Sequence, residues 1–261
     1  MQTLAAPTII QKEPHPKQRL GIWLFGLDRF HPPPDNIPVN EVLWGGQAAG
    51  GKSQLIRFLI TIIAIQWPGS RVSVFRRASP DLTKTQIMPF LKEVPENAGS
   101  FNHHNMMYTW NNGSTTEFNH CYESDDHLRF KSFEWDAIFF DESTEFPEEQ
   151  LTFLRARCRS TNPGWYPIIG YFTNPGSTSH LWHKRTFVDA APVGKPFWGS
   201  FETTAADIPL EGALPGHEFC VHEFEPIAGS HEYRCRRCGG TDFRSRRCFL
   251  QSRLSANPSL S

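Results

Sequence analysis

The chain lacks a segment long and apolar enough to cross a membrane. Of its 261 residues, the longest apolar run covers residues 58–67 and is interrupted by Thr61 and Gln66, whereas a spanning helix needs about 20 apolar residues. The amino terminus has no basic segment that leads into an apolar stretch, so no secretion signal is indicated. We therefore expect a soluble intracellular protein that does not bind membranes.

An excess of one charge is also lacking. The chain has 26 Lys and Arg against 27 Asp and Glu, which gives a formal net charge of -1. Proteins that stay bound to nucleic acid are usually basic, so this balance argues against that class and permits a protein that grips DNA transiently. Without a secretion signal, the six cysteines indicate reduced thiols or metal ligands rather than disulfides.

Aromatic residues are plentiful, with 21 Phe and 8 Trp, and the length suits one large domain with or without a small appendage. Residues 1–40 are rich in proline and are predicted to form a tail and an irregular lead-in. From there to about residue 188, short apolar segments alternate with helical patterns, which is typical of a three-layer α/β domain. Strands are expected at residues 42–44, 72–75, 137–140 and 167–172, helices at residues 52–67, 82–91 and 148–158, and a hairpin at residues 106–118.

A phosphate-binding loop is predicted at residues 46–53, which fit the pattern G-x-x-x-x-G-K-[ST] at every fixed position. Small residues allow backbone N–H groups to surround a phosphate, while Lys52 reaches its oxygens and the Ser53 hydroxyl binds Mg²⁺. The loop joins a predicted strand to a predicted helix, whose N-terminus would face the anion. The other interpretation is a glycine-rich turn that matches by chance. The residues expected to bind ATP are Gly46, Gln47, Ala48, Ala49, Gly50, Gly51, Lys52 and Ser53.

Two adjacent acids, Asp141 and Glu142, follow an apolar segment that is predicted to be a central strand. Ligands of open α/β sheets bind at the carboxyl ends of the strands, where Asp141 would support Mg²⁺ and Glu142 would activate the attacking water. The alternative is an acidic cap of the next helix, because Ser143 and Thr144 are also residues that begin helices. The phosphate loop upstream favours the catalytic interpretation, and the paired acids favour a hydrolase over a nucleotide kinase.

Four segments now form a series: residues 45–53, 75–82, 139–147 and 173–176. In order and spacing they resemble the successive motifs of the large subunits of tailed-bacteriophage terminases, over about residues 41–190. Residues 180–187 and 249–258 also resemble segments near the end of that family's motor domain. The resemblance implies a P-loop NTPase fold and a Mg²⁺-dependent ATPase that drives double-stranded DNA into a procapsid. It also implies a homo-oligomeric ring, contacts with the portal protein and the small terminase subunit, and a location in the host cytoplasm during virus assembly.

By the same resemblance, Thr173 and Asn174 match the motif that couples hydrolysis to movement. Polar side chains at the end of the strand beside the catalytic strand can sense the loss of a γ-phosphate. The alternative is a plain turn, since Asn-Pro-Gly forms turns in any protein.

The sequence departs from the family pattern in two ways. Many members carry an arginine inside the phosphate loop, and this chain has Gln47, Ala48 and Ala49 there. The missing charge would come from elsewhere, such as a neighbouring subunit, and the candidates are Arg76, Arg77, Arg155 and Arg157. The alternative for each of these arginines is a solvated charge or a structural ion pair. The family also continues into a nuclease domain, so we expect a motor domain without support for nuclease activity.

A cysteine and histidine cluster near the carboxyl terminus predicts a zinc site. Three thiolates and one imidazole suit a closed tetrahedral site, and the expected ligands are Cys220, His222, Cys235 and Cys238. Substitute ligands are Cys248, His217 and His231, and the alternative is a set of reduced cysteines in a tail. The predicted organisation is therefore an ATPase domain over residues 41–210, a zinc-ribbon-like insertion over residues 211–248, and a return segment of the motor domain over residues 249–261.

Positive charge is concentrated around these cysteines, where it would contact DNA phosphates or form a solvated surface. Two other functions stay open. One is a zinc-stapled nucleic-acid-binding adaptor with a regulatory nucleotide site, and Glu142 argues against it. The other is a helicase-type or recombinase-type P-loop ATPase, which the matches at residues 76–82 and 173–176 disfavour.

Overall fold

The computed structural model describes residues 13–27, 41–45, 51–160, 162 and 165–189, together with three short strands at residues 224–226, 233–235 and 247–250. Its centre is an eight-stranded sheet with the order β10-β1-β7-β6-β2-β5-β4-β3. The strands of this sheet are β1 (Glu41–Gly45), β2 (Arg71–Arg76), β3 (Gly99–Asn102), β4 (Met107–Trp110), β5 (Thr115–His120), β6 (Ala137–Asp141), β7 (Ile168–Thr173) and β10 (Arg247–Leu250).

Most of the sheet is parallel. Parallel pairing joins β10, β1, β7, β6, β2 and β5 in that order. The other edge is antiparallel, because β3, β4 and β5 follow one another through short turns. The turn between β4 and β5 holds Gly113 at a φ of 83°, a conformation that glycine adopts without strain. The predicted α/β fold with a mainly parallel sheet, including its hairpin, is therefore confirmed.

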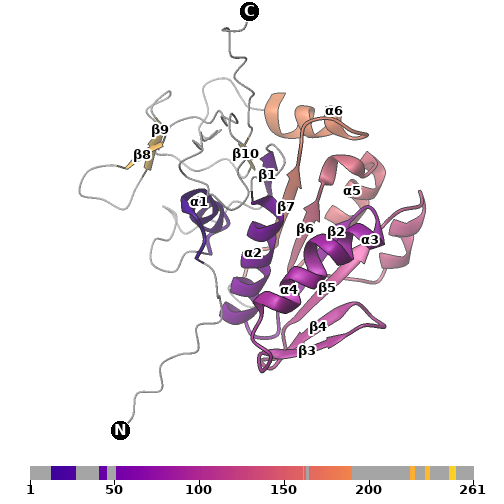
Figure 1. Ribbon diagram of the computed structural model, residues 1–261. Coiled ribbons are helices and arrows are strands. Elements are labelled where there is room, and N and C mark those ends of the chain that lie inside the picture. The colour runs from indigo at the N-terminus through magenta and orange to yellow at the C-terminus, as the bar shows by residue number, and fades with distance from the viewer. Residues whose placement is uncertain are drawn as a thin grey trace, which may run out of the picture.

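Both faces of the sheet are buried. In β6, Ala137 and Phe139 belong to one apolar cluster, whereas Ile138 and Phe140 belong to a second cluster on the opposite face. Successive side chains of a strand point to opposite faces, so a continuous apolar strand needs a covering layer on each side. These layers contain α1 (Pro16–Leu24), α2 (Lys52–Gln66) and α4 (Met88–Glu93) on one face, and α5 (Glu148–Arg155) and α6 (His180–His183) on the other (Figure 1).

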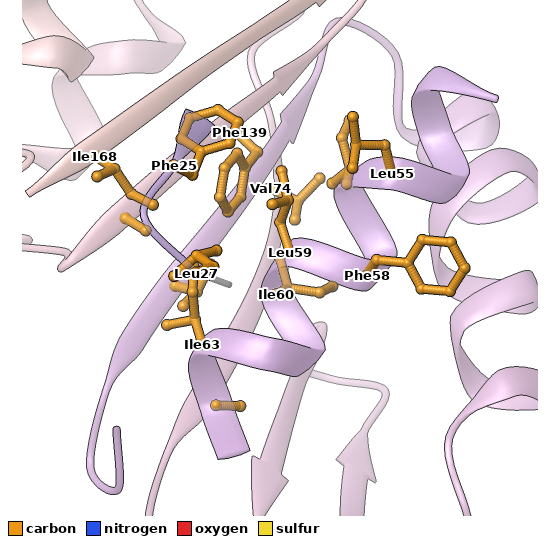
Figure 2. Close-up of a cluster of buried hydrophobic side chains, with 14 of the residues drawn as sticks. Phe25, Leu27, Leu55, Phe58, Leu59, Ile60, Ile63, Val74, Phe139 and Ile168 are labelled. Atoms are coloured by element: carbon orange, nitrogen blue, oxygen red, sulfur yellow. The ribbon is translucent and has the colours of Figure 1, made fainter. Parts of the chain in front are cut away.

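Helix α2 supplies much of the first layer. Its residues Leu55, Leu59 and Ile63 recur every four positions, which places them on one face of the helix, and all three are fully buried. Figure 2 shows this face beside Val74 of β2 and Phe139 of β6. Burying a side chain of this size stabilises the fold by about 1.5–3 kcal/mol, so α2 is held by packing as well as by its own hydrogen bonds.

Helix α1 corrects the expectation of an irregular lead-in. Pro16 stands at the start of this helix, a position that favours proline. Its carboxyl-terminal half and the residues after it contribute Trp23, Phe25 and Leu27 to the core, and Figure 2 places Phe25 and Leu27 beside α2. At least this part of residues 1–40 belongs to the domain; residues 1–12 and 28–40 lie outside the described residues.

One helical segment contains an uncommon π-helical turn. Where the sequence predicts a helix at residues 82–91, the chain forms α3 (Ser79–Leu82), the π-helix η2 (Thr83–Ile87) and then α4. A double hydrogen bond from Arg57 of α2 to Glu93, at 2.7 and 3.1 Å, fixes the segment against α2. Such π-helical turns are rare and recur at functional sites.

Near the carboxyl terminus the structure describes β10 and a two-stranded sheet of β8 (Phe224–Pro226) and β9 (Tyr233–Cys235). β10 pairs in parallel with β1 and contains the first residues of the predicted return segment; residues 251–261 lie outside the described part. No helix in the described part of the chain is long and apolar enough to cross a bilayer.

Candidate functional site

The register of the parallel strands brings the predicted catalytic residues to one edge of the sheet. Gly45 at the end of β1 pairs with Thr173 at the end of β7. Asp141 at the end of β6 pairs with Phe172, and β2 ends with Arg76 on the other side of β6. The carboxyl ends of adjacent parallel strands therefore form one site, as expected for an open α/β sheet.

The described end of the phosphate loop lies at this edge. Gly51 has a φ of 70°, a left-handed conformation that favours glycine, and it directly precedes Lys52 and Ser53, the first residues of α2. Residues Gly46, Gln47, Ala48, Ala49 and Gly50 lie outside the described residues, so their predicted contacts with phosphate stay predictions.

Asp141 is fully buried and accepts hydrogen bonds on both carboxylate oxygens. The Ser53 hydroxyl donates to Oδ1 at 3.3 Å. Arg76 Nη1 donates to Oδ2 at 2.6 Å and Gln86 Nε2 donates to the same oxygen at 3.0 Å. The two residues expected to hold Mg²⁺, Ser53 and Asp141, therefore lie side by side.

Glu142 is half-buried beside Asp141 and has a φ of 54°. A residue other than glycine rarely adopts this conformation, and such backbone strain recurs at active sites. Its carboxylate accepts hydrogen bonds from Asn174 Nδ2, at 3.1 Å to each oxygen. Burial raises the pKa of Glu142, and the charge of Asp141 adds to the rise, while Lys52 and Arg76 oppose it. A raised pKa suits a carboxylate that must accept a proton.

Asn174 also contacts the phosphate-loop lysine. Lys52 Nζ donates to Asn174 Oδ1 at 2.7 Å, so one amide joins Lys52 to Glu142. Burial lowers the pKa of Lys52, although the charges of Glu142 and Asp141 oppose that shift. The structure thus brings together Lys52, Asp141, Glu142 and Asn174, which the sequence places far apart.

Thr173 contacts the residues that follow Glu142. Its hydroxyl lies 2.5 Å from the hydroxyl of Thr144 and accepts a hydrogen bond from the Thr144 backbone N–H at 3.2 Å. The neighbouring Ser143 hydroxyl lies 2.8 Å from Nε2 of His183 in α6. Side-chain hydrogen bonds thereby join the end of β7 to the residues that follow β6. Neither Thr144 nor His183 was predicted as a site residue.

The residues present fit a magnesium ion held with a nucleotide. Mg²⁺ binds oxygen and usually takes one or two carboxylates in addition to phosphate oxygens and water, and Ser53 and Asp141 offer a hydroxyl and a carboxylate 3.3 Å apart. One further oxygen nearby, Oε1 of Gln86, is buried and has no hydrogen-bond partner in the described part of the chain.

Of the four arginines suggested as sources of the missing charge, Arg76 alone lies at this site. Arg77 donates to the backbone oxygen of Cys121 at 2.8 Å and Arg157 to that of Lys131 at 2.9 Å. Arg155 pairs with Glu41 at the amino end of β1. The charge of Asp141 raises the pKa of Arg76 even though burial opposes that rise, which keeps its guanidinium charged.

Gln18 of α1 is a site residue that the sequence did not reveal. It is almost fully buried, and its Nε2 donates to the backbone oxygen of Gly51 at 3.1 Å and to Oε1 of Gln54 at 3.2 Å. It thus supports the end of the phosphate loop from the amino-terminal segment. The only local signal here is the proline at the start of the helix, two residues before Gln18. Such a proline indicates where a helix begins but not which distant residues the helix contacts.

The predicted zinc ligands are not gathered in the described part of the chain. Cys220, His222 and Cys238, with the substitutes His217 and His231, lie outside the described residues. Cys235 ends β9 and Cys248 lies in β10, and only the backbone of these strands is described. No group of three or more His, Cys, Asp or Glu residues among the described residues could hold a metal ion.

The sequence matches no protein-family model and no curated protein. The structure is similar to the large terminase of a thermophilic bacteriophage, with a TM-score of 0.53 and 15% identity over 68% of this chain and 43% of that chain. It is also similar to the same terminase in complex with ATP-gamma-S, with a TM-score of 0.51 and 16% identity over 68% of this chain and 42% of that one. For the ADP complex, the TM-score is 0.51 and the identity 17% over 68% and 43%. This chain, which spans less than half the length of those terminases, therefore has the fold of the matched part of a bacteriophage large terminase.

Proposed function

We propose that this chain is a Mg²⁺-dependent ATPase, and that it is the motor domain of a terminase large subunit. The observation that carries the proposal is the meeting of Lys52, Asp141 and Glu142 at the carboxyl edge of the sheet, with Asn174 bonded to the first and the last of them at 2.7 and 3.1 Å. A nucleotide-binding switch needs a lysine and a metal-supporting acid. A second acid placed to accept a proton from water is needed only for hydrolysis.

Each residue then has a role in the reaction. Residues 46–53 bind the phosphates, Ser53 and Asp141 hold Mg²⁺, and Lys52 contacts the phosphate oxygens. When bound, Mg²⁺ neutralises phosphate charge as the terminal phosphoryl group is transferred to water. Glu142 orients the attacking water and accepts its proton, and the raised pKa of Glu142 favours that acceptance. Thr173 and Asn174 relay the loss of the phosphate to the rest of the domain.

We propose further that hydrolysis moves double-stranded DNA into a procapsid. The order and spacing of four motifs and the fold shared with the large terminase of a thermophilic bacteriophage support this. The partners would be DNA, the portal protein, the small terminase subunit and further copies of this chain in a ring. Residues 47–49 lack an arginine, so the charge that stabilises the transition state would come from a neighbouring copy in the ring or from Arg76 of this chain. Zinc, if bound by Cys220, His222, Cys235 and Cys238, would stabilise the segment before β10.

A substitution of the proposed base tests the ATPase. Glu142→Gln keeps the size of the side chain and its contact with Asn174 but cannot accept a proton. We expect nucleotide affinity to change by less than about threefold, while turnover falls by about 100-fold or more. The matched control is Glu149→Gln, an exposed acid in the first turn of α5, which should leave both quantities unchanged. Turnover that persists in Glu142→Gln would remove this residue from the role of base. A wild-type protein that binds ATP without hydrolysing it would favour the regulatory nucleotide site instead.

A further inference from the structure

The two oxygens of the Asp141 carboxylate have different surroundings. Oδ1 accepts one hydrogen bond, from the Ser53 hydroxyl at 3.3 Å. Oδ2 accepts two, from Arg76 at 2.6 Å and from Gln86 at 3.0 Å. The Thr85 hydroxyl also lies 3.4 Å from Oδ2, but it donates to the backbone oxygen of Asp81 at 2.8 Å. The carboxylate is therefore anchored through Oδ2, and its lightly bonded Oδ1 faces the phosphate-loop side of the site.

One of the two anchoring residues, Gln86, comes from the π-helix η2. The backbone of η2 is itself fixed, because Arg57 Nη1 donates to the backbone oxygen of Thr85 at 3.0 Å. The uncommon turn therefore has a local consequence: it holds an amide against Asp141.

Packing alone does not account for Gln86. Its side chain is completely buried, yet Oε1 has no hydrogen-bond partner within the described residues. Burying an unpaired amide oxygen costs free energy that an apolar side chain of the same length would avoid. The opposite orientation of the amide would place Oε1 against the Asp141 carboxylate, where two acceptors would repel each other. The contact of Nε2 with Asp141 thus explains why a glutamine stands here.

We propose that Gln86 is a positioning residue of the nucleotide site, which holds Oδ2 of Asp141 so that Oδ1 stays turned toward Ser53 and toward the magnesium ion. The inference rests on the proposed function. Arg76 shares the anchoring, but its positive charge also repels a divalent cation. Gln86 is neutral, so its loss changes the orientation of the carboxylate without changing the charge of the site.

Calorimetric titration of ADP against the folded protein measures this role without relying on turnover. In wild type we expect Mg²⁺ to tighten ADP binding, with a defined half-saturating concentration. Gln86→Met removes the amide and keeps the length of the side chain. Hydrogen bonds to ligating carboxylates are worth about 10–100-fold in metal affinity, so the half-saturating Mg²⁺ concentration should rise about tenfold. ADP affinity in the absence of metal should stay within about twofold, since the hydrogen bond of the Gln86 amide goes to Asp141 and not to the described phosphate loop.

Gln150→Met is the matched control. Gln150 is also a buried glutamine: its Oε1 accepts a hydrogen bond from Arg77, and its Nε2 donates to the backbone oxygen of Glu123. None of these hydrogen bonds involves Asp141. We expect it to lower the thermal midpoint without moving the Mg²⁺ requirement. If Gln86→Met does not fold, Gln86→Asn keeps an amide but shortens its reach, and should raise the Mg²⁺ requirement in the same way.

Three outcomes would overturn the inference. An unchanged Mg²⁺ requirement in the Gln86 variants would refute the positioning role alone. An equal rise in Gln150→Met would show that loss of any buried glutamine produces the effect. A wild-type protein whose ADP binding ignores Mg²⁺ would refute the proposed function, and the role of Gln86 with it.

Discussion

At the residue scale, Asn174 joins the two groups on which the proposed hydrolysis depends. Its oxygen accepts from Lys52 and its nitrogen donates to Glu142. Without an amide between them, the lysine and the carboxylate would be free to pair directly, since each already acts on the pKa of the other. A direct pair would turn Lys52 away from phosphate and Glu142 away from water.

Asn174→Ala is therefore expected to reduce the turnover number more than it weakens binding. A small misplacement of a catalytic group costs up to about 100-fold in rate, so we expect a fall of about 10–100-fold with the Michaelis constant changed by less than about threefold. Steady-state ATP hydrolysis measures both.

Asn112→Ala provides the comparison. Asn112 lies in the turn between β4 and β5, and its amide donates a hydrogen bond to the backbone oxygen of Ala64 in α2. It should lower stability and leave turnover intact. Equal kinetics in Asn174→Ala and wild type would contradict the bridging role.

The sequence predicted some of these residues and not others for a physical reason. Asp141 and Glu142 follow a recognisable apolar strand, and Lys52 stands in a fixed pattern, so local sequence was sufficient. Arg76 was one of four candidate arginines, and only the strand register shows that it alone reaches the site. Gln18 and Gln86 reach the site through helix packing and a π-helical turn, and neither feature has a local signature in the sequence. The phosphate-loop residues 46–50 stay a prediction.

At the scale of elements, one buried histidine links the end of β6 to α6. Nδ1 of His183 lies 2.9 Å from the backbone oxygen of Ser179, so this nitrogen carries the proton, and Nε2 is left to accept from the Ser143 hydroxyl at 2.8 Å. Burial lowers the pKa of His183 from 6.5 to about 4. The neutral imidazole thus connects α6 to the residue that follows Glu142.

This link predicts a loss of stability in acid. Because the pKa of His183 is lower in the folded chain, the unfolded chain binds a proton first as the pH falls from 6.5 toward 4. Between about pH 7 and about pH 5 the wild type should lose about 2 kcal/mol through this group.

His183→Gln removes the titrating group. The free energy of unfolding of this variant should therefore fall by less than that of the wild type between the same two pH values. Urea unfolding at both pH values gives the two differences. Parallel losses in wild type and variant would show that His183 does not titrate in this way.

The elements themselves were predicted unevenly. The buried strands β1, β2, β6 and β7 are short apolar runs bounded by turns, a pattern that predicts strands from the sequence alone. The amino-terminal helix α1 was missed because Pro16 and the surrounding prolines suggested an irregular segment, and its burial depends on contacts with α2, more than 30 residues away in sequence.

At the scale of the whole molecule, the described part of the α/β domain contains two free thiols, those of Cys121 and Cys158. Cys121 is buried, and burial raises its pKa to about 12. Burial also raises the pKa of Cys158. Thiols with raised pKa values are poor metal ligands near neutral pH, because metals bind the thiolate.

The proposed zinc site predicts that metal analysis of the purified chain finds about one equivalent of zinc. Cys238→Ser should abolish it, and Cys121→Ser should retain it, since Cys121 lies inside the α/β domain. If the wild type contains no zinc, the assignment of Cys220, His222, Cys235 and Cys238 as ligands is wrong. The proposal for the nucleotide site would stand, because it rests on other residues.

The last residues of β1 have a consequence for observing the molecule at work. Trp44 is 5% exposed, its indole lies 6.5 Å from the ring of Phe172, and the phosphate loop begins two residues later. An indole in this position is an intrinsic fluorophore beside the predicted nucleotide site, so we expect its emission to change when a nucleotide binds. The difference in emission between the wild type and Trp44→Phe would follow each cycle of binding and release in real time, without any attached dye.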